Sequence, residues 1–389
     1  MSCNRLKGKK LIICYAIFTA VVLINSPSPL SATVTGVCSN CHTMHNSQNG
    51  SQVARSGTGV GWDGSSVLTG GSLSGPLNQL LVTNCVGCHT STTNFTIINF
   101  GGSKIPIVFN TEGYPSDALA GGNFYWVSQR TVDLKYNAYG HNVYGIAGSD
   151  TLTQAPGKLP GCGTSGSCHM TLAAAPSTSG LWNNYNRGGC QGCHVYTSHH
   201  KDRGWYRFLK GHDGLNKDFS SGDDSDYVIG KGDTDWEKTK SSADHNWYKG
   251  TNTQYVSNGS ALKTYQTITS FCAGCHSRFH NTLDIARGGG PNYASPWLRH
   301  PTDILLYNKG GEYTAYDTVN AYSTEAPVAW TNPDSPSKET AVVMCLSCHR
   351  PHGSDQPDML RWDYATMIVG DDTKSGGCFT CHTSKNDAL

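Results

Sequence analysis

Residues 36–47 read GVCSNCHTMHNS, and this stretch decides the fold because it has the spacing of a covalent haem-binding peptide. Two residues separate Cys38 from Cys41, and His42 follows directly. In such a C-x-x-C-H peptide the two thiols form thioethers to a porphyrin, and the adjacent imidazole ligates the iron. A single match only suggests this interpretation, so the rest of the chain has to be searched for the same pattern.

The pattern occurs five more times in the 389 residues. These sites comprise Cys85, Cys88 and His89; Cys190, Cys193 and His194; Cys272, Cys275 and His276; Cys345, Cys348 and His349; and Cys378, Cys381 and His382. A zinc ribbon, a thioredoxin-like pair or a disulfide framework would explain paired cysteines, but none requires a histidine after each second cysteine. At this histidine content, six chance placements have a probability on the order of 10⁻⁹ to 10⁻⁸. The sequence therefore predicts haem c as the cofactor.

A seventh attachment site is irregular. Residues 162–169 read CGTSGSCH, so Cys168 and His169 occupy their expected places while Ser165 stands where the first cysteine is expected. The Gly- and Ser-rich spacer is flexible enough to let Cys162 reach the second vinyl group. A haem held by Cys168 alone and an ordinary disulfide are the alternatives. Of the sixteen cysteines two fall in the N-terminal leader and the other fourteen form seven consecutive pairs, which favours seven haems over six.

The N-terminus is predicted to be a secretory signal peptide covering residues 1–32. Four basic residues precede the apolar run Leu11–Ile24, which is followed by the small and polar stretch NSPSPLSA. The run is short for a membrane span and no second apolar segment follows. We therefore expect an exported chain without a transmembrane segment, located extracellularly or at the cell surface, with the periplasm as the alternative.

The composition predicts an interior built around cofactors. Hydrophobic residues make up 37% of the chain, and there are 45 glycines, which is poor material for a large aliphatic core. We expect residues 33–389 to form a single multihaem cytochrome domain, mostly irregular coil with short helices and little sheet around a chain of haems. Short helices are expected at 303–308, at 170–175 and at the attachment turns.

The charge balance argues against nucleic acid as a partner. Without the four basic residues of the leader, 25 lysines and arginines remain against 28 acidic residues. Each haem adds two propionates, so the loaded protein is acidic and would be repelled by a phosphate backbone.

Each haem iron needs a sixth ligand, and histidine is the best candidate because methionines are few. Nine histidines lie outside the attachment motifs. His45 follows His42 by about one helical turn and stays on the same side of the ring, so it has to bind a different haem. The same holds for His352 and His280. The predicted distal ligands are His45, His141, one of His199 and His200, His245, His280, His300 and His352, which leaves His212 out.

Several stretches resemble the extracellular filament-forming multihaem c-type cytochromes of metal-respiring bacteria, the doubled C-x-x-C-H family that includes hexahaem nanowires. They include CSNCHTMHNS, CQGCHVYTSHH, FCAGCHSRFH and CLSCHRPHGSDQPDMLRWDY. The resemblance implies an electron carrier that polymerises head to tail with identical subunits, in which His45 ligates a haem of the neighbouring subunit. Redox partner cytochromes and extracellular acceptors are the further partners that it implies. The seventh site departs from the hexahaem pattern.

Two other functions are open from the sequence. One is a monomeric periplasmic or surface shuttle of electrons. The other is a multihaem reductase, which would need an iron with an open sixth position, often marked by a lysine in place of the motif histidine. No C-x-x-C-K occurs here, so the sequence favours an electron carrier over an enzyme. An attachment site near each end of the mature chain also suits head-to-tail growth, because contacts between unlike surfaces do not close.

Overall fold

The computed structural model describes residues 36–53, 55–56, 59–64, 67–73, 75–78, 85–152, 155, 172–176, 188–194, 199, 206–209, 227–253, 260–276, 300–307, 311–371 and 373–385. The predicted signal peptide lies outside these ranges, as do Cys162, Cys168, His169, His200, His212 and His280. The single domain over 33–389 therefore stays a prediction.

The helices are short, and most are single 3₁₀ turns. The α-helices are α2 (Cys85–Cys88), α3 (Tyr125–Ser128), α4 (Ser260–Tyr265), α5 (Ile268–His276) and α6 (Gly311–Thr314). The 3₁₀ helices are η1 (Cys38–Asn40), η2 (Gln129–Thr131), η3 (Leu134–Tyr139), η4 (Gly189–Gly192), η5 (Tyr206–Phe208), η9 (Lys338–Thr340), η10 (Cys345–Ser347), η11 (Pro357–Met359), η12 (Tyr364–Thr366) and η13 (Gly377–Thr380).

The strands are mostly two residues long and form small, separate ladders. They are β1 (Ser47–Gln48), β2 (Ser51–Gln52), β3 (Arg55–Ser56), β4 (Gly61–Trp62), β5 (Leu68–Thr69), β6 (Ser72–Leu73), β7 (Thr90–Ser91), β8 (Ile97–Phe100), β9 (Ser103–Pro106), β10 (Phe109–Asn110), β11 (Gly230–Lys231), β12 (Trp247–Tyr248), β13 (Ala329–Trp330) and β14 (Ala341–Val342). One sheet has four strands in the order β10-β7-β4-β5, and β8 and β9 form an antiparallel hairpin. The expected fold class, mostly irregular with short helices and little sheet, is confirmed.

Five of the six described attachment motifs form single helical turns, as expected, and the motif at Cys272, Cys275 and His276 forms the end of the longer helix α5. In α2 the backbone N–H of His89 donates to the carbonyl of Cys85 at 2.9 Å, and His42, His194, His349 and His382 make the same bond to their own first cysteines. This i to i−4 bond closes one α-helical turn. It gathers both thiols and the imidazole on one side of the backbone, which is the arrangement that covalent attachment of a porphyrin needs.

The two other expected helices are wrong where the structure describes them. Residues 303–306 are not helical: Leu305 forms an isolated bridge to Val342, and Ile304 and Leu306 on either side of it are buried. Asp303 at φ 54° turns the chain before the bridge. Residues 172–175 form a turn in which the carbonyl of Leu172 accepts from both Tyr144 and Gly189. Contacts with distant segments override the local helix preference at both places.

The hydrophobic core consists of four small clusters beside the attachment sites. Cys272 packs against the cluster around Tyr248 and Ile268, Cys381 against the cluster around Trp330, and Cys190 against the cluster around Val127. Three attachment sites thus adjoin a patch of apolar side chains, as expected for a chain with cofactors at its centre.

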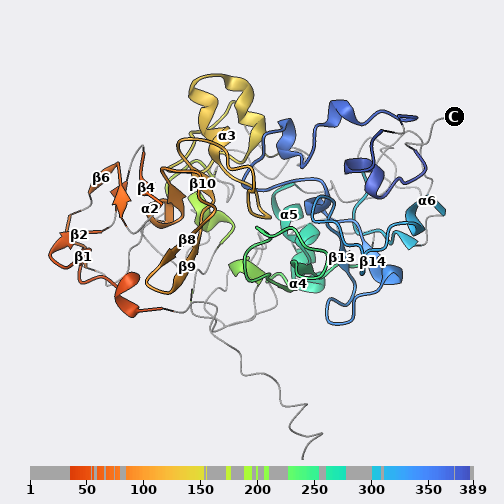
Figure 1. The fold of residues 1–389 in the computed structure, drawn as a ribbon, viewed down its shortest axis with the longest axis horizontal. Helices are drawn as coiled ribbons and strands as arrows, with labels where there is room; N and C mark the ends of the chain where they lie inside the picture. Colours follow the sequence, from red (N-terminus) through yellow and green to blue (C-terminus); the bar gives the residue numbers. More distant parts are fainter. Residues whose placement is uncertain are drawn as a thin grey trace, which may run out of the picture.

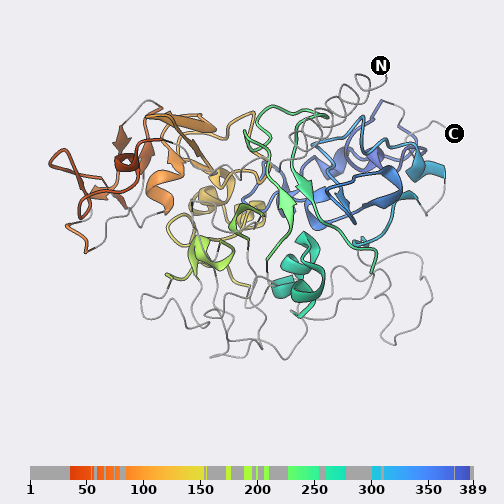
Figure 2. The same ribbon diagram turned by 90° about the horizontal axis from the view of Figure 1, so that it is seen from below.

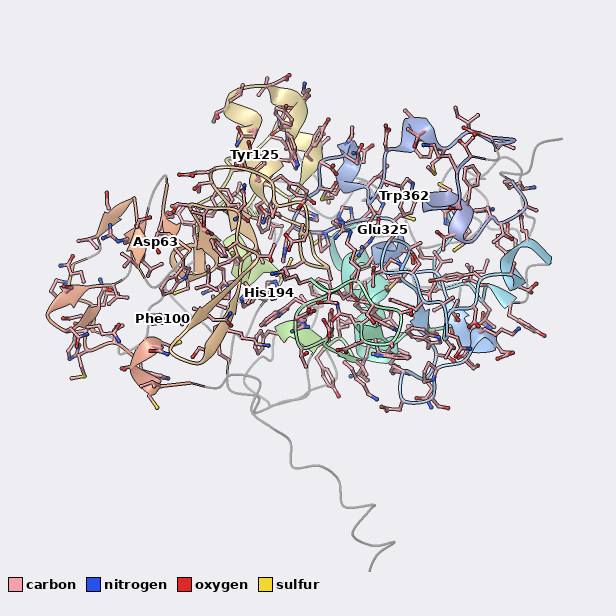
Figure 3. All side chains as sticks on the ribbon, in the orientation of Figure 1. Asp63, Phe100, Tyr125, His194, Glu325 and Trp362 are labelled. Carbon is pink, nitrogen blue, oxygen red and sulfur yellow. The ribbon has the colours of Figure 1, made fainter. Side chains whose placement is uncertain are left out.

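The chain follows the long axis of the molecule. The segment that carries β1 to β10 lies at one end in Figures 1 and 2, the C-terminal segment with α6, β13 and β14 lies at the other, and α4 and α5 lie between them. His194 is near the middle of this axis in Figure 3, between Phe100 towards one end and Trp362 towards the other. Successive attachment sites are therefore spread along the molecule.

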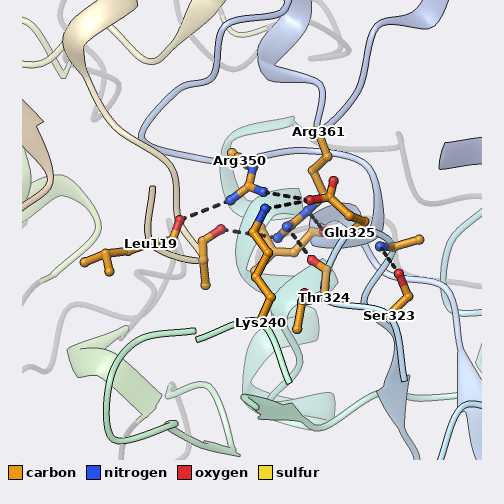
Figure 4. A network of polar contacts seen from close by, with 10 residues as sticks. Leu119, Lys240, Ser323, Thr324, Glu325, Arg350 and Arg361 are labelled. Carbon is orange, nitrogen blue, oxygen red and sulfur yellow. Dashed lines mark hydrogen bonds and ion pairs between the residues drawn. The ribbon is translucent and has the colours of Figure 1, made fainter. Parts of the chain in front are cut away.

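Two buried arginines connect the segment that follows Cys345 to residues 119–120 (Figure 4). Arg361 donates to the carbonyls of Leu346 at 2.7 Å, Thr324 at 3.0 Å and Ala120 at 3.3 Å. Arg350 donates to Leu119 at 3.1 Å and lies 3.8 Å from Glu325. Because a guanidinium carries five N–H donors, one arginine side chain can donate hydrogen bonds to several loop carbonyls at once.

Candidate haem-binding sites

Four histidines of the attachment motifs each face a second histidine, and the distance between the ring centroids is nearly the same in all four pairs. The ring centroids are 6.0 Å apart for His89 and His199, and 6.1 Å apart in the three other pairs. These other pairs are His276 with His141, His194 with His352, and His382 with His300. Every pair joins one motif histidine to one predicted distal histidine.

The geometry of the pairs fits a metal between the two rings. Imidazole nitrogens lie about 2 Å from a coordinated transition metal, so two rings on opposite sides of one metal have centroids roughly 6 Å apart. The angles between the ring planes range from 11° to 89°, as expected when each ring turns freely about the nitrogen–metal axis. If the rings were held by aromatic stacking, the angle between the ring planes and the sideways displacement of the rings would be restricted together.

A protein-only metal centre does not fit the same residues. Within the ranges that the structure describes, no three His, Cys, Asp or Glu side chains converge so as to hold a metal ion. Structural zinc needs four such ligands. The twelve motif cysteines within those ranges are free thiols, as haem attachment requires. Imidazoles in facing pairs, with two thiols beside one of them, are the donor set of a c-type haem with two axial histidines.

Most of these imidazoles are oriented by a backbone carbonyl. Nδ1 lies 2.7–2.9 Å from a carbonyl oxygen in seven histidines, namely His45, His89, His141, His194, His245, His300 and His349. A carbonyl only accepts, so Nδ1 carries the hydrogen and Nε2 is left with its lone pair. That tautomer is the one that ligates through Nε2.

Two of these carbonyls belong to residues in the left-handed region. Arg207, at φ 47°, turns its carbonyl to His194, and Asp358, at φ 58°, turns its carbonyl to His349. In both cases the histidine also bridges to the residue that lies two positions further on, Leu209 or Leu360. Non-glycine residues in this region are strained, and here the strain aims a carbonyl at a motif histidine. No sequence pattern marks either residue.

Burial keeps the imidazoles neutral. It lowers the pKa of His352 to about 3, and the nearby His194, His141 and His89 lower it further. Burial also lowers the pKa of His89, His141 and His194. A protonated imidazole cannot ligate, so these histidines are ready to bind iron at neutral pH.

The short segment 349–353 connects three sites. His349 is a motif histidine, the carbonyl of Pro351 accepts from Nδ1 of His141, and His352 faces His194. The amide of His352 donates to Gly121 at 2.8 Å, which holds the segment against the chain before α3. The sequence predicted that His352 serves a haem other than that of His349, and the structure brings it to His194 as a facing ring.

His245 is buried and aims an unpartnered nitrogen into the interior. It is 1% exposed, its ring stacks 3.5 Å from Tyr322, and its Nε2 has no hydrogen-bond partner among the described residues. A buried imidazole nitrogen without a partner is costly, and an iron ligated there would remove that cost. Among the described residues, His45 and His349 face no second histidine ring.

The thiols of successive sites approach one another. We number the sites along the chain, with Cys162 and Cys168 as site 3. Burial raises the pKa of Cys88 to about 12, and the charge of the nearby Cys41 raises it further. Hydrogen bonds link Cys85 to Cys190 and Cys272 to Cys345. The charge of Cys275 raises the pKa of Cys193, and the charge of Cys348 raises the pKa of Cys381. Among the sites that the structure describes, these contacts bring sites 1, 2, 4, 5, 6 and 7 next to one another in that order.

Site 7 has an acidic neighbour that the sequence analysis missed. Nδ1 of His382 lies 3.8 Å from Oε1 of Glu312, which begins the first turn of α6. Burial lowers the pKa of His382, while the charge of Glu312 raises it and Lys385 lowers it. Glu312 precedes His382 by 70 residues in a stretch without a motif, so no sequence signal could have found it.

The described part of the chain contains no helix that is both long and apolar enough to span a membrane.

Comparisons with known proteins agree with the donor set. Residues 336–387, which hold sites 6 and 7, match the family described as "Doubled CXXCH motif". The chain is 24% identical over 407 residues to the C-type cytochrome OmcS of Geobacter sulfurreducens, covering 92% of this chain and 86% of OmcS.

Two solved structures from the same organism are also similar to the chain. One is titled an outer membrane cytochrome S filament, with a TM-score of 0.40, 18% identity and 92% of each chain covered. The other is titled a cryo-EM structure of OmcS nanowires, with a TM-score of 0.37, 20% identity, and coverage of 92% of this chain and 93% of that one. The chain is therefore similar to the doubled-motif family over residues 336–387 and to a C-type cytochrome over most of its length.

Proposed function

We propose that the protein is a subunit of an extracellular filament that conducts electrons through bis-histidine c-type haems. The observation that carries this proposal is the set of four facing imidazole pairs at 6.0–6.1 Å. Irons with two firmly held axial imidazoles exchange electrons without binding a substrate. When bound, each haem accepts and releases one electron.

The residues of the chain perform three tasks in this function. The paired imidazoles would hold the irons of four haems, one imidazole from each side. The backbone carbonyls at Nδ1 fix the ring orientation, so that little has to rearrange when the charge on the metal changes. The thiol contacts bring the edges of neighbouring sites together, and electron tunnelling falls steeply with distance. We infer a conduction order of sites 1, 2, 4, 5, 6 and 7, which matches the layout along the long axis.

The proposed ligand sets follow the ring pairs. His199 serves site 2, His352 site 4, His141 site 5 and His300 site 7. His199 is thereby favoured over His200. His45, His245 and His280 remain for the irons of His42, His169 and His349. A haem at site 3, attached through Cys162 and Cys168, brings the proposed total to seven.

Assembly into a filament is the finer part of the proposal. His45 lies two residues before β1, which is at one end of the molecule in Figure 1, and its Nδ1 donates to the Leu77 carbonyl at 2.9 Å. We propose that its Nε2 ligates a haem of the adjacent subunit. The similarity to OmcS, which is titled a nanowire in its solved structures, supports this assignment.

The test compares the purified holoprotein with two neighbouring variants. Negative-stain microscopy of the wild-type protein is expected to show fibres, and its intact mass is expected to show seven haems. His45→Ala should keep the haem count but lose the fibres, because it removes only a ligand lent to another subunit. Met44→Ala changes an adjacent side chain that is 66% exposed and should leave the fibres intact.

Three outcomes would overturn parts of the proposal. A wild-type protein that elutes as a single small species on size exclusion would be a monomeric shuttle. Fibres formed by His45→Ala would remove the inter-subunit ligand. Extensive carbon monoxide binding by the reduced wild-type protein would reveal open iron positions and favour a reductase.

A further inference from the structure

The two faces of site 7 are built differently. On one face, Nδ1 of His300 contacts the neutral carbonyl of Pro301 at 2.9 Å. On the other, Nδ1 of His382 lies 3.8 Å from the carboxylate of Glu312, an ion-pair distance rather than a hydrogen bond. The two rings are 6.1 Å apart.

Glu312 is held in place from several directions. It is 16% exposed, its Oε2 accepts from Ser384 at 3.2 Å, and its backbone carbonyl accepts from Thr383. Both hydroxyls belong to the residues that directly follow His382. The attachment segment thus holds α6, and through it the carboxylate, beside its own motif histidine.

A carboxylate differs from a carbonyl in its effect on a ligating imidazole. Negative charge beside Nδ1 makes Nε2 a stronger donor and stabilises the ferric over the ferrous state of the iron. In a partly buried position this charge is weakly screened. The contacts of the seven histidines held by carbonyls carry no net charge.

We propose that Glu312 is a positioning residue that lowers the reduction potential of the iron ligated by His382. This inference rests on the proposed function only in that His382 and His300 ligate a haem. One electron from an external mediator reduces the ferric iron to ferrous, and the charge of Glu312 opposes that step. Site 7 would then set the potential at the C-terminal end of the conduction path.

Lys385 makes the proposal testable in both directions. Its Nζ lies 3.9 Å from Oε2 of Glu312, and it is 53% exposed. It therefore offsets part of the charge of the carboxylate. Removing Glu312 and removing Lys385 have opposite effects on the iron if the effect is electrostatic.

The experiment is spectroelectrochemical titration of the full holoprotein with redox mediators. With seven attachment sites, one haem contributes roughly one-seventh of the haem absorbance. Glu312→Gln should shift the reduction potential of one such component to a more positive value. Lys385→Gln should shift the same component to a more negative potential by a smaller amount. His300→Met identifies that component, because a thioether ligand raises its potential.

The control is Glu339→Gln, which removes the same charge from an exposed position on η9 and should shift no component. Unchanged potentials in Glu312→Gln, or shifts of both variants in one direction, would overturn the proposal. Low-spin electron paramagnetic resonance signals should persist in both variants, since a purely structural role would instead release the ligand. A wild-type protein without low-spin covalent haem would overturn the proposed function itself, which is a separate result.

Discussion

His352 is a residue whose role depends on a distant partner. It follows His349 by three positions, yet its ring lies beside Phe124 at 4.9 Å and faces His194 at 6.1 Å. Local spacing excludes its own haem but says nothing about which other haem it serves. The partner is settled only by the path of the chain, which brings segment 349–353 against Gly121.

Replacing His352 with alanine is expected to open one iron. Site 4 would lose its sixth ligand, and roughly one-seventh of the haem, by the number of sites, should become high-spin and bind carbon monoxide when reduced. Difference spectra and electron paramagnetic resonance measure this fraction. The matched variant is His212→Ala, because His212 lies outside the attachment motifs and is not in the proposed ligand set. It should leave both spectra unchanged. A His352→Ala protein that stays fully low-spin would contradict the pairing with His194.

Asp303 is a buried acid that makes stability depend on pH. It is 1% exposed, and burial raises its pKa to about 8, while the Thr269 hydroxyl acts in the opposite direction. Between its ordinary pKa and about 8 the folded state binds more protons than the unfolded state, so the free energy of unfolding falls as pH rises through this range.

Asp303→Asn should therefore remove that pH dependence. At pH 8 the variant is expected to be more stable than the wild type by roughly 2 to 5 kcal/mol, and the gain should vanish near pH 4. Urea unfolding followed by circular dichroism at several pH values measures it. Equal stability of the two proteins at pH 8 would show that the carboxyl finds a partner in the loaded protein.

At the scale of elements, close backbone packing explains why short segments can position ligands. Gly353 has φ +129°, and a Cβ there would lie 2.6 Å from the carbonyl oxygen of Tyr139 and 2.8 Å from that of Asn123. Only glycine fits both the conformation and the space. The absence of one side chain is what allows segment 349–353 to reach three haem sites.

Gly353→Ala is expected to lower the free energy of unfolding by roughly 2 to 4 kcal/mol, from backbone strain and overlap together. The same change should loosen the ligand contacts of His352 and His141, which a rise in high-spin signal would report. Gly75→Ala provides the comparison, because a Cβ at Gly75 meets nothing within 4 Å. If the two variants have the same urea midpoint, the packing argument for Gly353 is wrong.

The elements also show what the sequence can and cannot predict. The attachment turns were predictable because the spacing of Cys85, Cys88 and His89 is itself a local geometry. The helix expected at 303–308 was wrong because the bridge between Leu305 and Val342 joins residues far apart in the chain. Glu312 and the left-handed Asp358 were invisible for the same reason, since their roles arise only when distant segments meet.

For the whole molecule, the thiol contacts form a line that passes from site 2 directly to site 4. Because sites 2 and 4 contact each other directly, we expect electrons to pass between them without site 3. The double variant Cys162→Ala/Cys168→Ala should lose the mass of one haem while its fibres conduct along their length as before. Conductance of single fibres between electrodes measures this.

The matching double variant Cys345→Ala/Cys348→Ala removes site 6, which lies between sites 5 and 7 in the line of contacts. Tunnelling across the resulting gap is much slower, so its fibres should lose most of their conductance. A similar loss in both double variants would show that site 3 belongs to the main path.

Segment 349–353 also bears on how the protein matures. The loop carries the attachment histidine His349, contacts His141 and supplies His352, so we expect it to close fully only when the haems proposed for these ligands are in place. Protease resistance during biosynthesis should then rise abruptly near the last attachment event rather than in equal steps, and intermediates with few porphyrins should be degraded before they leave the cell.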